Sequence, residues 1–155
     1  MKPKRKPINT ARERAINLLA RREHSRKELN DKLLQKGFEQ PEITEALDSL
    51  QAKNWLSDQR FTESWIRHRV NTKHGKLKIC YELTLKGVNK TIINQTLNDL
   101  SLDWFEVAVK AWHKKYRKLP IDHTERAKQI RYLNSRGFSF DEANYALEQA
   151  KALLE

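Results

Sequence analysis

Apolar residues recur every three or four positions along most of the chain, and charged or amide side chains stand between them. Ile43, Ala46 and Leu47 show the spacing, which places all three side chains on one face of a helix. No run of comparable length alternates apolar and polar residues as a half-buried strand does. The pattern therefore predicts an all-α protein.

The pattern itself repeats at an interval of fifty residues. Residues 33–38 read LLQKGF, residues 83–88 read LTLKGV and residues 133–138 read LNSRGF. Each copy has a leucine, two variable residues, a cation, a glycine and an apolar residue. Self-similarity at a fixed period is the mark of repeat architectures, so the chain is interpreted as three copies of one helical unit.

Glycine marks the end of one helix in each copy. A residue of positive φ commonly follows the last helical turn, and glycine adopts it without steric cost, while the preceding cation suits the negative end of the helix dipole. Helix starts are marked as clearly, by capping-box spacing, a first-turn proline and a capping serine. The residues are Gly37, Gly87 and Gly137 for the ends, and Ser25 with Glu28, Ser139 with Glu142, Pro41 and Ser57 for the starts.

A leading helix in each copy, over residues 10–22, 58–73 and 102–118, brings the expectation to three helices per copy. In the last of these helices we expect Phe105 and Val109 to face the core. The fold predicted is three tandem three-helix repeats, resembling helix-turn-helix units, that form an elongated, curved molecule. The predicted parts are a basic disordered arm over 1–9, then repeats over 10–53, 54–100 and 101–155. We expect Trp55 and Leu56 to form a packed junction.

The charge balance narrows the class of partner. There are 31 Lys and Arg against 20 Asp and Glu, a formal net charge of +11, which favours polyanions or an acidic protein surface. The single cysteine, Cys80, cannot form an intramolecular disulfide, and no apolar run is long enough for a membrane span or a signal peptide. We expect a monomeric cytoplasmic protein that does not enter the membrane.

Residue patterns typical of catalysis are missing from the sequence. Four glycines leave no phosphate-binding glycine motif, and the five histidines include neither an i, i+4 pair nor an HExxH motif. Cys80 has no surroundings that would lower its pKa and is interpreted as a small core residue. We expect no catalytic residue, no cofactor and no metal site, and hence no enzyme.

Cations concentrate in two stretches that we predict to bind the partner. Residues 60–90 carry eight Lys or Arg and two Glu, and residues 110–118 carry five cations and no acid. Trp112 and Tyr116 in the second stretch could stack on bases, but their i, i+4 spacing favours a shared core face. The predicted contact residues are Arg60, Arg67, Arg69, Lys73, Lys76, Lys78, Lys86, Lys110, Lys114 and Lys115.

The middle copy resembles the RecX regulatory proteins. The resemblance is carried by residues 54–61, NWLSDQRF, and continues through Arg69, Gly75 and the glycine segment 82–88. It extends to SRKEL at residues 25–29 and RGF at residues 136–138, so it spans nearly the whole chain. Trp55, Thr62 and Lys76 depart mildly from the family pattern.

This resemblance implies a function in recombination, DNA repair and the SOS response. It implies a protein that lodges in the groove of the RecA filament on DNA and modulates, mostly by inhibition, RecA's ATPase, strand exchange and filament growth. Weak, non-specific binding to single- and double-stranded DNA would accompany it. Two alternatives stay open: a helix-turn-helix protein that reads duplex DNA directly, with residues 90–100 as recognition helix, and a scaffold for an acidic protein.

Overall fold

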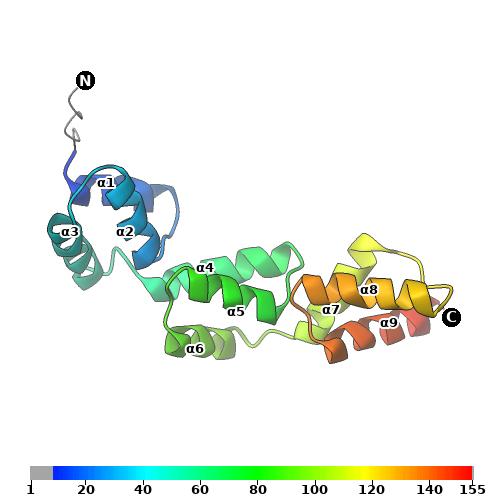
Figure 1. Ribbon diagram of the computed structural model, residues 1–155. Coiled ribbons are helices and arrows are strands. Elements are labelled where there is room, and N and C mark those ends of the chain that lie inside the picture. The colour runs from blue at the N-terminus through cyan, green and yellow to red at the C-terminus, as the bar shows by residue number, and fades with distance from the viewer. Residues whose placement is uncertain (1–8, 155) are drawn as a thin grey trace, which may run out of the picture. The chain divides into compact units, whose positions relative to one another are not determined.

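The computed structural model describes residues 9–154, so nearly all of the predicted basic arm lies outside the described residues. Within this range the chain forms nine helices and no strand (Figure 1). The prediction of an all-α protein is confirmed. The helices are α1 (Ala11–Arg21), α2 (Arg26–Gln35), α3 (Gln40–Ala52), α4 (Asp58–Asn71), α5 (Lys76–Leu85), α6 (Lys90–Leu100), α7 (Trp104–Lys115), α8 (His123–Ser135) and α9 (Phe140–Leu154).

The helix starts use the residues that the sequence marks. The Ser25 hydroxyl accepts a hydrogen bond from the Glu28 backbone N–H at 3.1 Å, and the Glu28 carboxylate accepts one from the Ser25 N–H at 3.2 Å. Ser139 and Glu142 form the same reciprocal pair before α9, at 3.1 and 2.9 Å. These bonds satisfy backbone donors that the helix itself leaves without partners, so both predicted capping boxes are confirmed.

The three glycines adopt the left-handed backbone conformation that their position predicts. Their φ angles are +93° at Gly37, +79° at Gly87 and +100° at Gly137. At the ends of α2 and α8 the glycine N–H bonds the carbonyl three residues back, and the next N–H, of Phe38 or Phe138, bonds the carbonyl of Leu33 or Leu133. Both ends are therefore Schellman motifs, closed by a buried phenylalanine.

The helices pack into two compact units, and the division runs through the middle triplet. The first unit holds the residues up to Ser64 together with Thr84–Ile93, and the second holds Trp65–Leu83 and the chain from Asn94 onward. In the first unit α1, α2 and α3 enclose a core of fully buried leucines and Ile43. In the second unit α7, α8 and α9 enclose Trp112, Phe138 and Leu147, each at most 2% exposed.

Phe105 on α7 does not lie where the hydrophobic pattern predicts. Phe105 is 43% exposed and stands edge-on to Tyr145, while the core of α7 is formed by Ala108, Ala111 and Trp112 with Val107. The apolar residues of α7 cover more than half of the helix circumference, so the pattern alone does not fix which part of that arc is buried. The prediction that Phe105 faces the core is wrong.

The expected junction at Trp55 and Leu56 is only half right. Leu56 is buried, but Trp55 is 51% exposed. The Arg12 guanidinium and the Lys53 ammonium lie 5.6 and 5.7 Å from the Trp55 ring, within the range of cation–π attraction. Trp55 therefore packs against two cationic side chains at the surface and does not fill a core.

In each unit the start of one helix rests on the glycine turn that ends another. In the first unit the Ser25 hydroxyl donates to the Lys86 carbonyl at 2.8 Å. In the second unit the Gly75 N–H donates to the Arg136 carbonyl at 2.8 Å, and the Leu77 N–H to the Gly137 carbonyl at 3.1 Å. Ser25 and Gly75 are fifty residues apart, so the same junction occurs twice. Donors left free at one helix start thereby satisfy acceptors left free at another helix end.

The junction in the second unit leaves no room for a side chain at its glycines. A Cβ on Gly75 would lie 2.4 Å from the Gly137 carbonyl carbon, and a Cβ on Gly137 would lie 2.4 Å from the Lys78 Cβ. Gly37 also has a positive φ, but nothing lies within 4 Å of the position of its Cβ. A comparison of Gly137 with Gly37 therefore separates the cost of a left-handed backbone from the cost of a close contact.

We expect Gly137→Ala to destabilise its unit more than Gly37→Ala destabilises the other. Both substitutions strain a left-handed backbone, at about 1–2 kcal/mol. Gly137→Ala also forces overpacking against Lys78, which adds roughly 1–3 kcal/mol. Urea unfolding followed by circular dichroism measures both losses, and equal losses in the two variants would show that the tight junction does not exist.

Candidate functional site

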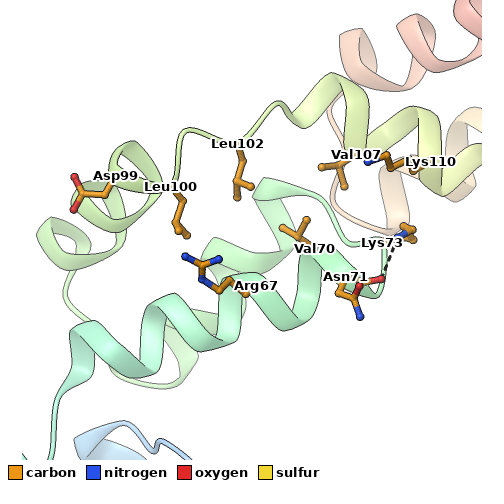
Figure 2. A pocket seen from close by; sticks show the side chains of 9 residues that line it. All are labelled: Arg67, Val70, Asn71, Lys73, Asp99, Leu100, Leu102, Val107 and Lys110. Carbon is orange, nitrogen blue, oxygen red and sulfur yellow. Dashed lines mark hydrogen bonds between the residues drawn. The ribbon is translucent and has the colours of Figure 1, made fainter.

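A cleft of about 500 Å³ lies in the second unit, where the end of α4, the α6–α7 connection and α7 meet (Figure 2). We call it the basic cleft. Three of the ten predicted contact residues line it together with six other residues. The full lining is Arg67, Val70, Asn71, Lys73, Asp99, Leu100, Leu102, Val107 and Lys110.

The local backbone explains how these cations reach one cleft. Arg67, Val70 and Asn71 follow i, i+3, i+4 spacing on the last turns of α4 and so share a face. Lys73 follows the end of α4 with a φ of +66°, unusual for a residue with a side chain, and its ammonium donates to the Asn71 carbonyl at 3.2 Å. Lys110 comes from the exposed face of α7. Residues more than forty positions apart in sequence thus line one hollow.

The charge of the basic cleft is positive. Asp99 is the one acidic residue among the nine that line it, and Figure 2 shows its carboxylate turned away from Arg67. Arginine and lysine donors can make charge-assisted hydrogen bonds with an oxyanion that enters such a hollow. The arrangement is suited to holding a phosphate or carboxylate group.

A second cleft, of about 590 Å³, lies between α7 and α9 and shares Lys73 and Lys110 with the basic cleft. We call it the α7–α9 groove. It adds Lys114 to the predicted residues that the structure brings together. Its lining is Lys73, Val109, Lys110, Trp112, His113, Lys114, Arg117, Ala150 and Leu153.

Three predicted contact residues are engaged in ion pairs within their own unit. Arg69 makes a two-pronged pair with Glu82, with Nε–Oε1 and Nη2–Oε2 distances of 3.0 and 2.6 Å. Arg60 Nε lies 3.0 Å from Glu23 Oε1. Since a paired charge attracts an external anion less, these residues are better suited to holding helices together than to binding a partner.

Lys86 is the third, and it belongs to the junction of α2 with the Gly87 turn. Its ammonium lies 3.5 Å from Glu28 Oε2, which Arg22 also contacts at 2.9 Å. Burial alone would raise the pKa of the Glu28 carboxyl. Hydrogen bonds from Arg22 and the Ser25 backbone, with the charges of Arg22 and Lys86, outweigh burial and lower the pKa to about 2. Glu28 therefore stays ionised and keeps Lys86 in place.

The remaining predicted cations line neither cleft. Lys76 is exposed on the first turn of α5, and Lys78 is the residue against which Gly137 packs. The Lys115 ammonium lies 5.2 Å from the Tyr132 ring. The structure thus divides the predicted set, with Arg67, Lys73, Lys110 and Lys114 in the clefts and the other six elsewhere.

Trp112 and Tyr116 belong to the core, as their spacing predicts. Trp112 is 2% exposed, and its indole N–H donates to the side-chain oxygen of Gln129 at 2.7 Å. Tyr116 stands edge-on to Tyr132 with the ring centroids 5.5 Å apart, and burial raises the pKa of its hydroxyl. The buried Trp112 ring presents no exposed face on which a base could stack.

His74 lies buried between cations at the α5–α8 junction. Its Nδ1 is 2.9 Å from the Thr72 hydroxyl, and Arg136 Nη2 donates to the Thr72 carbonyl at 2.7 Å. Burial, and then the charges of Arg136 and Arg69, lower the pKa of His74 to about 4. His24, fifty residues earlier, also has a lowered pKa because it is buried. Both imidazoles are therefore neutral at pH 7.

Within residues 9–154, no three His, Cys, Asp or Glu side chains come together in a way that could hold a metal ion. No helix in that same range is both long and apolar enough to span a membrane. The two clefts are the places in the described part of the chain where predicted contact cations come together around a hollow.

Fold and clefts together define a class of protein, a tandem array of three-helix units with a cationic surface. Three family models match the chain, at residues 11–50, 57–97 and 102–147. They are described as "RecX, first three-helix domain", "RecX, second three-helix domain" and "RecX, third three-helix domain". The chain belongs to the RecX family of regulatory proteins.

Individual relatives support the same family. A regulatory protein RecX of Vibrio parahaemolyticus is 40% identical over 142 residues, which cover 91% of this chain and 92% of that protein. One from Haemophilus influenzae is 42% identical over 130 residues, 82% and 86% of the two chains. The crystal structure of RecX from Lactobacillus salivarius is 25% identical, with a TM-score of 0.74 over 92% of this chain and 95% of that one.

We expect acid to destabilise the second unit through His74. Between about pH 6.5 and pH 4 an unfolded chain binds a proton at this residue and the folded chain does not, so stability is present above pH 6.5 and decreases as the pH falls. The free energy of unfolding should fall by up to about 1.4 kcal/mol per pH unit in that range.

Denaturant unfolding at several pH values measures this slope in the wild type and in His74→Asn, which keeps a polar group beside Thr72. We expect a shallower slope in the variant, with the contribution of His24 remaining. Identical slopes would exclude His74 as the source.

Proposed function

We propose that this protein binds the RecA filament on DNA, lodges in the filament groove, and mostly inhibits ATP hydrolysis, strand exchange and filament growth. Membership of the RecX family carries the proposal. The basic cleft supports it, because it brings Arg67, Lys73 and Lys110 together around a hollow open to an anion. We also propose that the chain acts as a cytoplasmic monomer.

The cations suit a nucleic-acid backbone without reading its sequence. Lysine and arginine gain affinity for DNA by displacing counterions from phosphates, a contribution that is independent of sequence and declines steeply with salt. A filament on DNA presents phosphates in a regular array, so a few such contacts can fix the orientation of the bound protein while contacts with RecA supply selectivity. Binding to DNA alone would then be weak and salt-sensitive.

The predicted limits of the repeats, 10–53, 54–100 and 101–155, remain a proposal. They treat each triplet of helices as one module. In a tandem array the modules can each contact a different subunit of a repetitive partner, which suits a filament. The middle triplet carries Arg67 and Lys73, so we propose that it supplies the main contacts with phosphate.

One observation keeps the alternative of direct duplex reading open. Asn94, Gln95 and Asn98 are exposed on α6, and amide side chains can read adenine in the major groove. Lys90 is the one cation of α6, and Asp99 adds a negative charge near its end. Footprinting on random duplexes without RecA separates the two, because sequence-selective protection would favour the alternative.

We expect reversal of the cleft cations, in the triple variant Arg67→Glu, Lys73→Glu and Lys110→Glu, to weaken inhibition of RecA's DNA-dependent ATPase by at least tenfold. Three repulsive charges would replace three attractive ones where the phosphates lie. The measurement is the concentration of protein that halves ATP hydrolysis, at two salt concentrations, with filament length scored by electron microscopy.

Its matched control is Arg21→Glu, Lys128→Glu and Arg131→Glu, which makes the same change in net charge at exposed positions outside both clefts. The control should inhibit within about twofold of the wild type at the higher salt concentration, where long-range attraction is screened. Full inhibition by the cleft variant, with helicity intact, would show that the basic cleft is not the contact site.

A further inference from the structure

The α7–α9 groove differs in chemistry from the basic cleft beside it, because its floor is aliphatic. Val109 from α7 and Ala150 and Leu153 from α9 line it, together with Trp112, of which only 2% is exposed. Leu153 is 77% exposed, while Ala150 is 3% exposed at the bottom of the groove. A large exposed leucine beside an apolar hollow is the kind of surface that an apolar side chain of another molecule can cover.

A comparison of the repeats shows why the hollow exists. Counted in steps of fifty, Ala146 and Leu147 of α9 correspond to identical residues of α3, but Ala150 corresponds to Leu50. Leu50 is fully buried and fills the core of the first unit. Alanine at position 150 lacks three carbon atoms that leucine supplies in the first repeat, so the corresponding place between α7 and α9 stays open. The groove is a property of the third repeat.

The rim of the groove is cationic. Lys110, Lys114 and Arg117 follow one another at intervals of four and three residues, and Lys73 joins them from the segment after α4. No Asp or Glu lines the groove. Four cations around an aliphatic floor form a surface complementary to a segment that carries carboxylates beside an apolar side chain.

We infer that the α7–α9 groove binds an acidic segment of a protein partner, one of whose aliphatic or aromatic side chains rests on Ala150 while its carboxylates meet the cationic rim. Amphipathic segments dock in this way, with apolar anchors in a groove and charges at its edge. The inference rests on the proposed function, because the partner is then a protein of the RecA filament, and it deepens that function by separating protein contact from phosphate contact.

The chemistry of the floor argues against a nucleobase as the occupant. Bases bind non-specifically by stacking on exposed aromatic faces, but Trp112 is buried and its N–H already bonds Gln129. A second copy of the chain is disfavoured by charge, since each copy carries +11 and two such cationic rims repel each other. An acidic protein segment with an apolar side chain complements both the aliphatic floor and the cationic rim.

The test fills the groove without changing its charge. Ala150→Leu restores the residue that the first repeat has at this position, so we expect thermal stability to be kept and the groove to be closed. Binding to RecA filaments on oligo(dT) should weaken at least tenfold in co-sedimentation, whereas binding to free oligo(dT), measured by fluorescence anisotropy, should stay within twofold. Ala127→Leu is the matched control, because it adds the same atoms at an exposed position of α8.

A second variant covers the case in which Ala150→Leu does not fold. Leu153→Glu changes an exposed side chain, so stability should hold, and it replaces an apolar contact of the groove with a negative charge that repels the carboxylates of the partner. We expect the same selective loss of filament binding. If the wild type binds filaments and both variants bind them equally well, the inference is wrong and the proposed function stands. If both variants lose oligo(dT) binding to the same degree, the groove holds nucleic acid and the inference is wrong.

Failure of the proposed function has a different outcome. If the wild type does not bind RecA filaments at all, the function is wrong, and the groove is then probed with a fluorescein-labelled twelve-residue peptide of glutamate and leucine arranged at helical spacing. Binding by the wild type and by Ala127→Leu but not by Ala150→Leu would support the groove as a site for acidic segments. Absence of binding by the wild type would overturn it.

Discussion

The architecture depends on one constraint, the close approach of a helix start to a glycine turn. Where Gly75 meets Gly137, backbone groups pair at 2.8 and 3.1 Å, and a single Cβ on either glycine would collide with its neighbour. The contact connects donors and acceptors that helices necessarily leave without partners at their ends. Glycine has two separate uses there, the left-handed backbone and the absence of a side chain. The equivalent junction in the first unit replaces one backbone donor with the Ser25 hydroxyl.

The cations of the chain differ in what they contact. Arg60, Arg69 and Lys86 pair with carboxylates of their own unit, whereas Lys73 and Lys110 line hollows. A net charge of +11 therefore does not describe a uniformly basic surface. Part of the positive charge holds helices together, where a partner benefits little from it. Another part lines the two clefts of the second unit.

The two clefts share Lys73 and Lys110 but present different floors. In the basic cleft the cations stand with Asn71, and in the α7–α9 groove they surround aliphatic side chains. Adjacent sites of this kind suit a composite partner in which an anionic backbone and a protein surface lie side by side. A RecA filament on DNA, the partner that we propose, is composite in this way.

The sequence alone determined the helices, their ends and the repeat, because capping residues and glycine turns act over a few neighbouring positions. Ser25, Gly37 and Gly137 do in the structure what local geometry requires of them. The family also followed from sequence, through motifs spread along the chain. Tertiary structure alone decided which cations line a cleft, since that depends on which carboxylates, such as Glu82, come within reach after folding. It also decided that Phe105 of α7 is exposed, and that Ala150 opens a groove where Leu50 fills a core. These outcomes depend on how helix faces meet, and a pattern read along one helix does not contain that information.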